Sequence, residues 1–315
     1  MTLRLLSASR LRAARTCARL HQYQYELGYR PVEEARALRF GTLVHRGLEA
    51  WWLAVQADQP QEAWLDAALD ALAGEADPYD AARAQVLLTG YHVRWKDEPY
   101  EVLAVEAKFE APLINPESGA PSRTWRLAGK VDAVVRDKRD GLVRLVEHKT
   151  SSDDLTPGSP YFARLRLDSQ VSVYFAGAKA LGFDVAGCLY DVLGKPRHRP
   201  LEANSRRAEP ESPEAFRERL GAAVAEEPSK YFQRAEVVRL EGELREFDFD
   251  TWQQAKLLRE IELAGVAPRN GDACVRFNRV CPYLEVCSGS ASLEDERLFR
   301  RAGPHPELVE PAASP

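Results

Sequence analysis

Two runs of alternating apolar and polar residues lie near the middle of the sequence, TWRLAGKVDAVVRD (124–137) and LVRLVEHKT (142–150). Both are rich in Val and Leu, and the Asp140-Gly141 pair between them is typical of a turn. The pattern therefore predicts a β-hairpin.

The expected register of this hairpin brings two acids together. With the turn centred on Arg139-Asp140, Asp132 lies directly opposite Glu147, and both side chains share one face of the sheet. Lys149, two residues further on, lies on that face too. Carboxylates about 5 Å apart repel each other unless a cation lies between them, and such oxygen ligands suit Mg²⁺ or Mn²⁺. The lysine would then position a water and neutralise charge on a phosphate. The alternative is a surface hairpin with an ordinary Glu–Lys pair.

The rest of the pattern predicts helices around a short sheet. Apolar residues three and four positions apart indicate helices, and period-two runs indicate strands. The predicted helices cover residues 3–25, 41–57, 61–73, 79–94, 161–181, 213–227 and 247–264, and the further strands cover 101–113 and 184–193. Residues 194–213 and 271–288 are expected to be loops, and 301–315 a disordered tail. This order predicts an α/β domain with a short mixed sheet flanked by helices.

The composition is that of a soluble globular protein, with 45% hydrophobic and 29% charged residues among 315. A formal net charge of −5 argues against a globally basic coat for nucleic acid, although a local groove can still bind one. No run of about 18 apolar residues is present, so we expect no membrane span. The Arg-rich start resembles a transit peptide, but an amphipathic first helix is the favoured interpretation.

Four further residues accompany the hairpin. His45 lies on the apolar face of a predicted helix, where a satisfied core histidine is the more common case. Gln170 and Tyr174 are four residues apart and share a helix face. Glu106 is an acid within an apolar strand, so it is either an additional ligand or an ion-pair partner. None of these residues is specific by itself.

Together these residues resemble a known family. Their order is Gly41-x3-His45, Gly129-x-x-Asp132, Glu147-His148-Lys149 and Gln170-x3-Tyr174. This order resembles the RecB-type nuclease domain of the PD-(D/E)xK superfamily, over about residues 17–287. The resemblance implies a restriction-endonuclease-like core that hydrolyses phosphodiester bonds with a bound divalent metal.

The resemblance also implies a role for each matching residue. The residues placed at the Mg²⁺ or Mn²⁺ ion are His45, Asp132, Glu147 and, through its backbone carbonyl, His148. Lys149 would be the catalytic lysine. Gln170 and Tyr174 would contact DNA or brace the site.

The five cysteines are too unevenly spaced for a disulfide framework, and four of them resemble those of the iron–sulfur branch of this family. That branch includes CRISPR-associated exonucleases and the nuclease domains of AddB-type helicase–nucleases. It implies a [4Fe–4S] cluster on Cys17, Cys274, Cys281 and Cys287. The chain departs from the family in one gap, because six residues, where two are usual, separate Cys274 from Cys281. A structural Zn²⁺ is therefore the rival ligand. Cys188, in an apolar strand, is expected to be a buried core thiol.

One nuclease domain is expected over residues 1–300. It would comprise a helical part (1–100) with Cys17 and His45, a catalytic sheet with the Gln/Tyr helix (101–193), and helices with the cluster loop (194–300). The cluster would join the N-terminal helix to the C-terminal loop and so close the fold.

The expected activity is that of a metal-dependent, cytoplasmic DNA exonuclease acting on single strands, in repair or recombination. Arg164, Arg166 and Lys179 would contact phosphates or form a solvated helix face, and Trp51 and Trp52 would stack on bases or belong to the core. No P-loop is present, so any unwinding would come from a partner such as a helicase or a protein of recombination or CRISPR adaptation. The alternative is a non-catalytic DNA-binding or assembly subunit with the same fold, although the complete set of site residues argues against decay.

Overall fold

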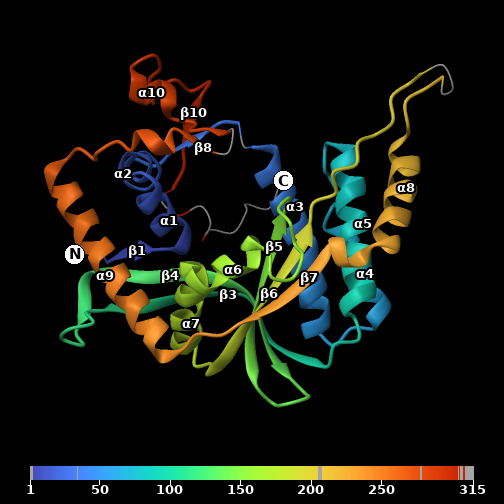
Figure 1. The fold of residues 1–315 in the computed structure, drawn as a ribbon, viewed down its shortest axis with the longest axis horizontal. Helices are drawn as coiled ribbons and strands as arrows, with labels where there is room; N and C mark the ends of the chain where they lie inside the picture. Colours follow the sequence, from blue (N-terminus) through green and yellow to red (C-terminus); the bar gives the residue numbers. More distant parts are fainter. Residues whose placement is uncertain are drawn as a thin grey trace.

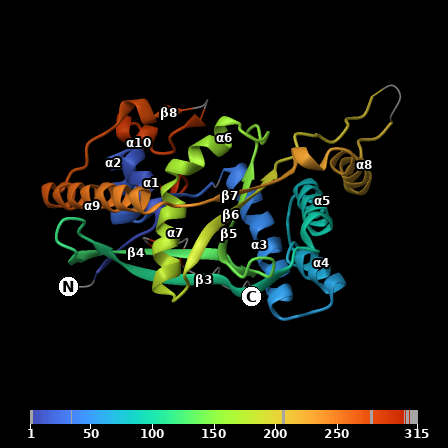
Figure 2. The same ribbon diagram turned by 60° about the horizontal axis from the view of Figure 1, so that its bottom comes forward.

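A six-stranded mixed sheet forms the centre of the molecule, with helices on both of its faces (Figure 1 and Figure 2). The computed structural model describes residues 3–33, 35–204, 208–276, 279–303, 305 and 308. The strands of the sheet are β1 (Arg4–Leu6), β3 (Tyr100–Ile114), β4 (Pro121–Asp137), β5 (Val143–Ser151), β6 (Val185–Gly194) and β7 (Phe232–Val237). Their order is β1-β4-β5-β6-β7, and β3 also pairs with β4. The predicted α/β class with a mixed sheet flanked by helices is confirmed.

Two strands, β1 and β5, pair with the same edge of β4. β3 pairs with nearly the whole length of β4, so β1 and β5 must both lie on the opposite edge. There β1 pairs in parallel with Trp125–Leu127, and β5 pairs antiparallel with Ala133–Arg136. Residues 128–132 of β4 lie between these two partners. The sheet therefore opens next to Asp132.

The register of the β4–β5 hairpin is the predicted one. Ala133 pairs with Val146 and Val135 pairs with Arg144, which is the alignment expected from a turn centred on Arg139-Asp140. Gly141 completes the turn with a φ of 77°, a left-handed conformation that favours glycine. Alternation along β5 then places Glu147 and Lys149 on one face and His148 on the other.

Two apolar cores lie on opposite faces of the sheet. One core includes residues of α1 (Ala8–Thr16), α7 (Ser169–Ala180) and α9 (Glu241–Ala264). The other includes residues of α3 (Arg36–Gln56), α4 (Gln61–Asp70), α5 (Pro78–Trp95) and α8 (Pro213–Glu226). Trp51 and Trp52 are each 3% exposed within this second core, so the hypothesis that they stack on bases is wrong. No helix among the described residues combines the length and apolar character needed to span a bilayer.

A third, small core joins the two ends of the chain. Its buried residues are Tyr23, Tyr29, Tyr283 and Phe299. The elements of this region are α2 (Ala18–His21), the π-helix η1 (Gln22–Glu26), β2 (Tyr29–Pro31), η4 (Gly271–Ala273), β8 (Val275–Arg276), β9 (Arg279–Val280), α10 (Leu284–Ser288) and β10 (Phe299–Arg301). β10 pairs antiparallel with β2, and α10 lies beside α2 in Figure 1.

The first segment differs from the single helix predicted for residues 3–25. Arg4–Leu6 form β1, and Ser7 caps α1 by accepting a hydrogen bond from the backbone N–H of Arg10. The chain leaves the helical conformation again at Cys17. A strand of three residues leaves little alternation to detect, and its leucines also fit helical spacing.

Other elements differ from the sequence pattern as well. The predicted helix over 161–181 is divided into α6 (Pro160–Ala163), η2 (Arg164–Leu167) and α7, because Asp168 is extended and caps α7. The strands β7, β8, β9 and β10 and the short helix η3 (Pro228–Lys230) were not predicted. Arg301 lies in β10, so the tail predicted from residue 301 begins inside a strand, and beyond it only residues 302, 303, 305 and 308 are described.

Candidate active site

Asp132 and Glu147 lie where β4 and β5 separate. The ladder ends at Ala133 and Val146, one pair before the two acids would face each other. There the Asp132 Oδ2 atom accepts a hydrogen bond from the backbone N–H of His148 at 2.7 Å. The Asp132 side chain therefore takes the place of the next backbone hydrogen bond of the ladder. It binds His148, the β5 residue that follows Glu147.

Glu147 is the most buried group of this site, with 1% of its side chain exposed. Its Oε1 atom accepts a hydrogen bond from Gln170 Nε2 at 2.7 Å and pairs with the Lys149 ammonium. Its Oε2 atom is buried and has no hydrogen-bond partner among the described residues. A buried, unpartnered carboxylate oxygen is unfavourable unless a cation or a donor reaches it.

His45 reaches the acids from α3, with Nδ1 at 3.9 Å from Asp132 Oδ2. A Cβ atom on Gly41, one helical turn earlier, would meet Thr150 Oγ1 at 3.3 Å, so glycine lets α3 lie close to β5. Loss of surrounding water lowers the pKa of His45 to about 4, although Asp132 opposes the shift and 35% of the side chain is exposed. The imidazole is therefore neutral at pH 7, which is the form that binds metals.

Asp132 and Lys149 each shift the pKa of the other through their charges. Burial alone would raise the pKa of Asp132, but interactions with His45 and His148, which are charged only at low pH, with the Lys149 ammonium and with the His148 backbone N–H outweigh burial and lower it. Burial lowers the pKa of Lys149, and the Asp132 charge opposes that shift. Asp132 is therefore an anion at neutral pH, next to a lysine that loses its proton more readily than usual.

Gln170, in the first turn of α7, binds Glu147, and Tyr174 one turn later accepts a hydrogen bond from Gln170. Asp168 caps this helix and accepts a hydrogen bond from the Gln170 backbone N–H at 2.8 Å. The Gln170 amide donates both to Glu147 and, at 2.8 Å, to Tyr174 Oη. Arg12 of α1 donates to Gln170 Oε1 at 3.3 Å. Sequence reasoning missed Arg12 because no local pattern places it beside a residue of α7.

Glu106 lies next to the site but is paired with Lys130. Its ladder neighbours Val105 and Ala107 pair with Ala133 and Val131, so Glu106 is opposite Asp132 on the other edge of β4. Its φ of 51° is left-handed, which is uncommon for glutamate. Of the two roles expected from the sequence, the structure has the ion pair.

The candidate phosphate contacts on the 161–181 segment are not gathered at the acids. The Arg164 guanidinium lies over the Tyr161 ring at 4.5 Å, and Arg166 pairs with Glu243 at 3.2 Å. Lys179 is at the opposite end of α7 from Gln170, where burial raises the pKa of Asp248 and the Lys179 charge opposes that shift. Among the described residues, none of the three forms an ion pair with Asp132 or Glu147.

A second buried carboxylate, Asp191 of β6, lies on the opposite face of the sheet. Arg234 donates to both of its oxygens, at 3.2 and 2.7 Å, and Tyr91 Oη donates to Oδ2 at 3.0 Å. Burial alone would lower the pKa of Arg234, but Asp191 raises it. His148 Nδ1 lies 3.7 Å from Asp191 Oδ2, and its ring packs between Tyr91 and Trp52. This buried network packs against the His148 side chain of β5, on the face of the sheet opposite Glu147.

The four candidate cluster ligands lie in one region, to which both ends of the chain contribute. The Cys281 backbone N–H donates to Cys274 O at 2.7 Å, and the Asn270 backbone N–H donates to Cys17 Sγ at 3.4 Å. Burial raises the pKa of Cys281, and the charges of Cys274, Cys287 and Cys17 raise it further. As placed, no three His, Cys, Asp or Glu side chains in the described ranges form a group that could hold a metal ion.

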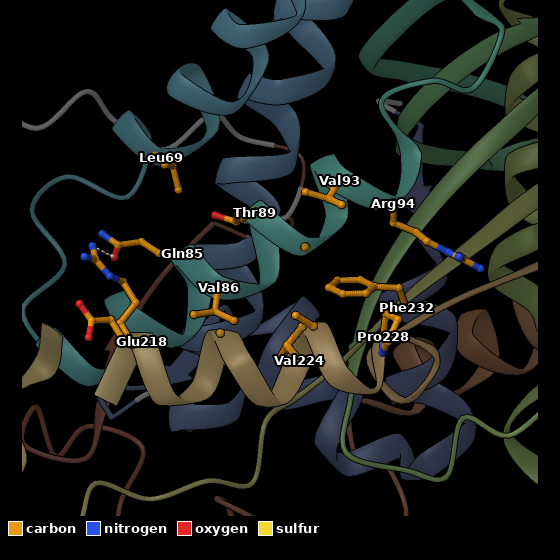
Figure 3. A pocket seen from close by; sticks show the side chains of 14 residues that line it. Leu69, Gln85, Val86, Thr89, Val93, Arg94, Glu218, Val224, Pro228 and Phe232 are labelled. Atoms are coloured by element: carbon orange, nitrogen blue, oxygen red, sulfur yellow. Dashed lines mark hydrogen bonds between the residues drawn. The ribbon is translucent and has the colours of Figure 1, made fainter. Parts of the chain in front are cut away.

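Two further features, one predicted from the sequence and one not, lie outside the set of candidate site residues. Cys188 is fully buried in the core, as predicted, and burial raises the pKa of its thiol. A cavity of about 650 Å³ lies between α5 and α8, lined by apolar residues such as Val86, Val224 and Phe232 (Figure 3). It contains none of the site residues, and nothing in the structure shows what occupies it.

Comparison with known proteins identifies the family. The family model described as "PD-(D/E)XK nuclease superfamily" matches residues 5–288. A solved structure titled "Crystal structure of SSO0001" is 17% identical, with 58% of this chain and 72% of that chain covered, at a TM-score of 0.23, which is too low to support an inference. No curated protein gives a significant match. With a family match over nearly its whole length, the chain belongs to the PD-(D/E)XK nuclease superfamily.

Proposed function

We propose that this protein is a divalent-metal-dependent DNA nuclease, and that it acts as an exonuclease on single-stranded DNA. The observation that carries the proposal is the Glu147 carboxylate, which is buried beside Asp132 with one oxygen unpartnered among the described residues. A buried anion of this kind is stabilised by a bound cation. Nuclease chemistry is typical of the superfamily to which the chain belongs.

The proposed metal ligands are His45, Asp132, Glu147 and the backbone carbonyl of His148. Carboxylate and carbonyl oxygens with one neutral imidazole suit Mg²⁺ or Mn²⁺. Such a cation would supply Lewis-acid activation of the phosphate and of the attacking water. The unpartnered Oε2 atom of Glu147 and the neutral state of His45 both fit this role.

The remaining residues would orient and stabilise the reacting groups. Lys149 contacts Glu147 and lies in the field of Asp132, so we assign to it the positioning of the water and the neutralisation of charge on the phosphate. Gln170 and Tyr174 would keep Glu147 in its orientation.

Hydrolysis of end-labelled single-stranded DNA in Mg²⁺ or Mn²⁺ tests the activity. The wild type is expected to release nucleotides from linear strands and to leave a circular single strand intact, because an exonuclease needs an end. Lys149→Ala should remain folded and inactive, whereas Lys138→Ala, at the exposed β4–β5 turn, is the matched control. Equal rates for wild type and Lys149→Ala would contradict the mechanism, and cleavage of the circle would assign endonuclease action instead.

We further propose that Cys17, Cys274, Cys281 and Cys287 hold a [4Fe–4S] cluster. An all-thiolate set suits such a cluster, and the mutual effect of these thiols on the pKa of Cys281 supports their proximity. The rival is a Cys₄ zinc site. Analysis of iron, acid-labile sulfide and zinc in the purified protein separates the two. Cys281→Ala should lose the metal and unfold more easily, while Cys188→Ala should keep the metal; full retention of metal and stability by Cys281→Ala would exclude the site.

A further inference from the structure

Another cavity, of about 390 Å³, is lined by residues of α1, α7 and α9. These three helices pack against one another (Figure 1). Ser169 and Ser172 of α7 line the cavity, whereas Gln170, between them in the sequence, binds Glu147. The cavity and the candidate active site therefore lie on different sides of the same helical turn. Pockets for small organic ligands begin at about 300 Å³, so this cavity has room for a nucleotide.

The wall of this cavity contains a buried cation whose hydrogen bonds all go to neutral oxygens. Arg239, just before α9, is 8% exposed, and its guanidinium donates to Ser172 Oγ at 2.9 Å. Its other acceptors are backbone carbonyls, at 2.9, 2.8 and 3.2 Å, of Leu165, Asp168 and Val238. The nearby acid Glu243 is paired with Arg166 at 3.2 Å. A buried charge without an opposite charge beside it is unfavourable unless an anion binds there.

Two exposed arginines of α1 connect the cavity with the active site. Arg15 lines the cavity, and Arg12, three residues earlier on the same helix face, donates to Gln170 Oε1 at 3.3 Å. Burial is the main cause of the lowered pKa of Lys149, and the Arg12 charge lowers that pKa further. Neither arginine forms an ion pair within the described part of the chain. Unpaired cations on one helix face attract a polyanion.

The opposite wall of the cavity is acidic. It is formed by three residues of α9, namely Glu243, Glu246 and Asp250. Like charges repel, so an anion in the cavity would lie on the side of α1 and α7, next to Arg15 and Arg239. The cavity therefore offers one place, and not a broad basic surface, to a phosphate.

We propose that this cavity binds the nucleotide that adjoins the scissile phosphate, with its own phosphate held by Arg15 and Arg239. The proposal rests on the proposed nuclease function and commits to a single DNA strand as the occupant. The phosphate would supply the anion that Arg239 lacks, and Arg12 would contact the strand between Glu147 and the cavity.

Strand binding without divalent metal tests this site independently of hydrolysis. Fluorescence anisotropy is measured with labelled oligo-dT of about 12 nucleotides, which is within the length range of single-strand sites. Arg15→Ala should weaken binding roughly fivefold and lower the salt slope by about 0.7, the value for one phosphate contact. Arg15→Lys should bind like the wild type, because it keeps the charge. Arg123→Ala makes the same change at an exposed position of β4 outside the cavity lining, and it should alter neither quantity.

A double variant and a free anion complete the experiment. Arg15→Ala combined with Arg239→Gln should weaken binding by less than the product of the single effects, because both residues hold one phosphate. Melting curves accompany Arg239→Gln, since Arg239 also binds three backbone carbonyls. Inorganic phosphate, added at constant ionic strength, should displace the strand from the wild type more effectively than from Arg15→Ala.

Two results would overturn the strand site. One is an unchanged affinity and salt slope in Arg15→Ala. The other is inorganic phosphate that raises the thermal midpoint of the wild type without displacing the strand, since the cavity would then bind the free ion. An inactive wild type that still shows the Arg15 effect would refute the proposed nuclease activity and leave the strand site intact.

Discussion

Glu147 and Asp191 are two carboxylates on neighbouring strands, each 1% exposed, and their surroundings are opposite in kind. Both oxygens of Asp191 accept hydrogen bonds, from Arg234 and Tyr91. Glu147 has one partnered oxygen and one oxygen without a partner in the described structure. Burial is the same, so burial alone does not separate a structural acid from a functional one. The difference is in how completely the protein satisfies the carboxylate.

This difference assigns separate roles to the two faces of β5 and β6. The Asp191 carboxylate is fully hydrogen-bonded without a ligand, although the ring nitrogens of the neighbouring His148 have no partner among the described residues, and its ion pair with Arg234 should contribute to stability. The Glu147 site is incomplete without a cation, and it should contribute to activity at some cost in stability. His148 joins them, because its backbone N–H binds Asp132 while its ring lies beside Asp191.

The largest expected effect is on activity. Glu147→Gln removes a metal ligand and should lower the rate of hydrolysis by about 10³-fold or more. It should not lower the thermal midpoint, because it removes an incompletely satisfied buried charge. Rates and melting curves on the same preparation check both statements. An unfolded Glu147→Gln variant would show that Glu147, like Asp191, is needed for stability.

The next effect is on stability. Asp191→Asn leaves the Arg234 charge buried without its partner and should cost about 3 kcal/mol of unfolding free energy. Denaturant titration measures this loss. The double variant Asp191→Asn with Arg234→Met should recover most of it, because no buried charge then remains. If Asp191→Asn were as stable as the wild type, the network would not be a structural one.

Binding of a divalent cation should have a smaller effect, and it needs no substrate. Mn²⁺ at about 100 times its Kd should raise the unfolding free energy of the wild type by about 2.7 kcal/mol. The same addition should have little effect on Glu147→Gln and its full effect on Tyr91→Phe, whose substitution lies in the other network. Equal stabilisation of all three proteins would place the cation elsewhere.

The smallest effects come from single hydroxyl groups. Tyr91→Phe removes one hydrogen bond to Asp191 and should cost about 1 kcal/mol. Tyr174→Phe removes one of the two acceptors of the Gln170 amide, and Gln170 keeps its hydrogen bond to Glu147. Tyr174→Phe should therefore cost less unfolding free energy than Tyr91→Phe. Parallel denaturant titrations compare the two losses of unfolding free energy. A larger loss for Tyr174→Phe would contradict the assignment of the greater contribution to stability to the Asp191 face.

Most of the sheet at the site was predictable because its determinants are local. Alternation in β4 and β5 and the Asp140-Gly141 turn define the hairpin register, and the register brings Asp132 to Glu147. β1, β8 and β9 were missed because strands of two or three residues carry almost no periodicity. Their pairing depends on partners far away in the chain.

The sequence alone therefore determined which acids share a strand pair, which lysine accompanies them and which helix carries Gln170 and Tyr174, since these relations follow from backbone periodicity. Only the tertiary structure decided how well each acid is satisfied. The contact of Arg12 with Gln170 and the approach of His45 to Asp132 both depend on packing between distant segments. No local pattern encodes such contacts, because they arise when separate elements close around the sheet.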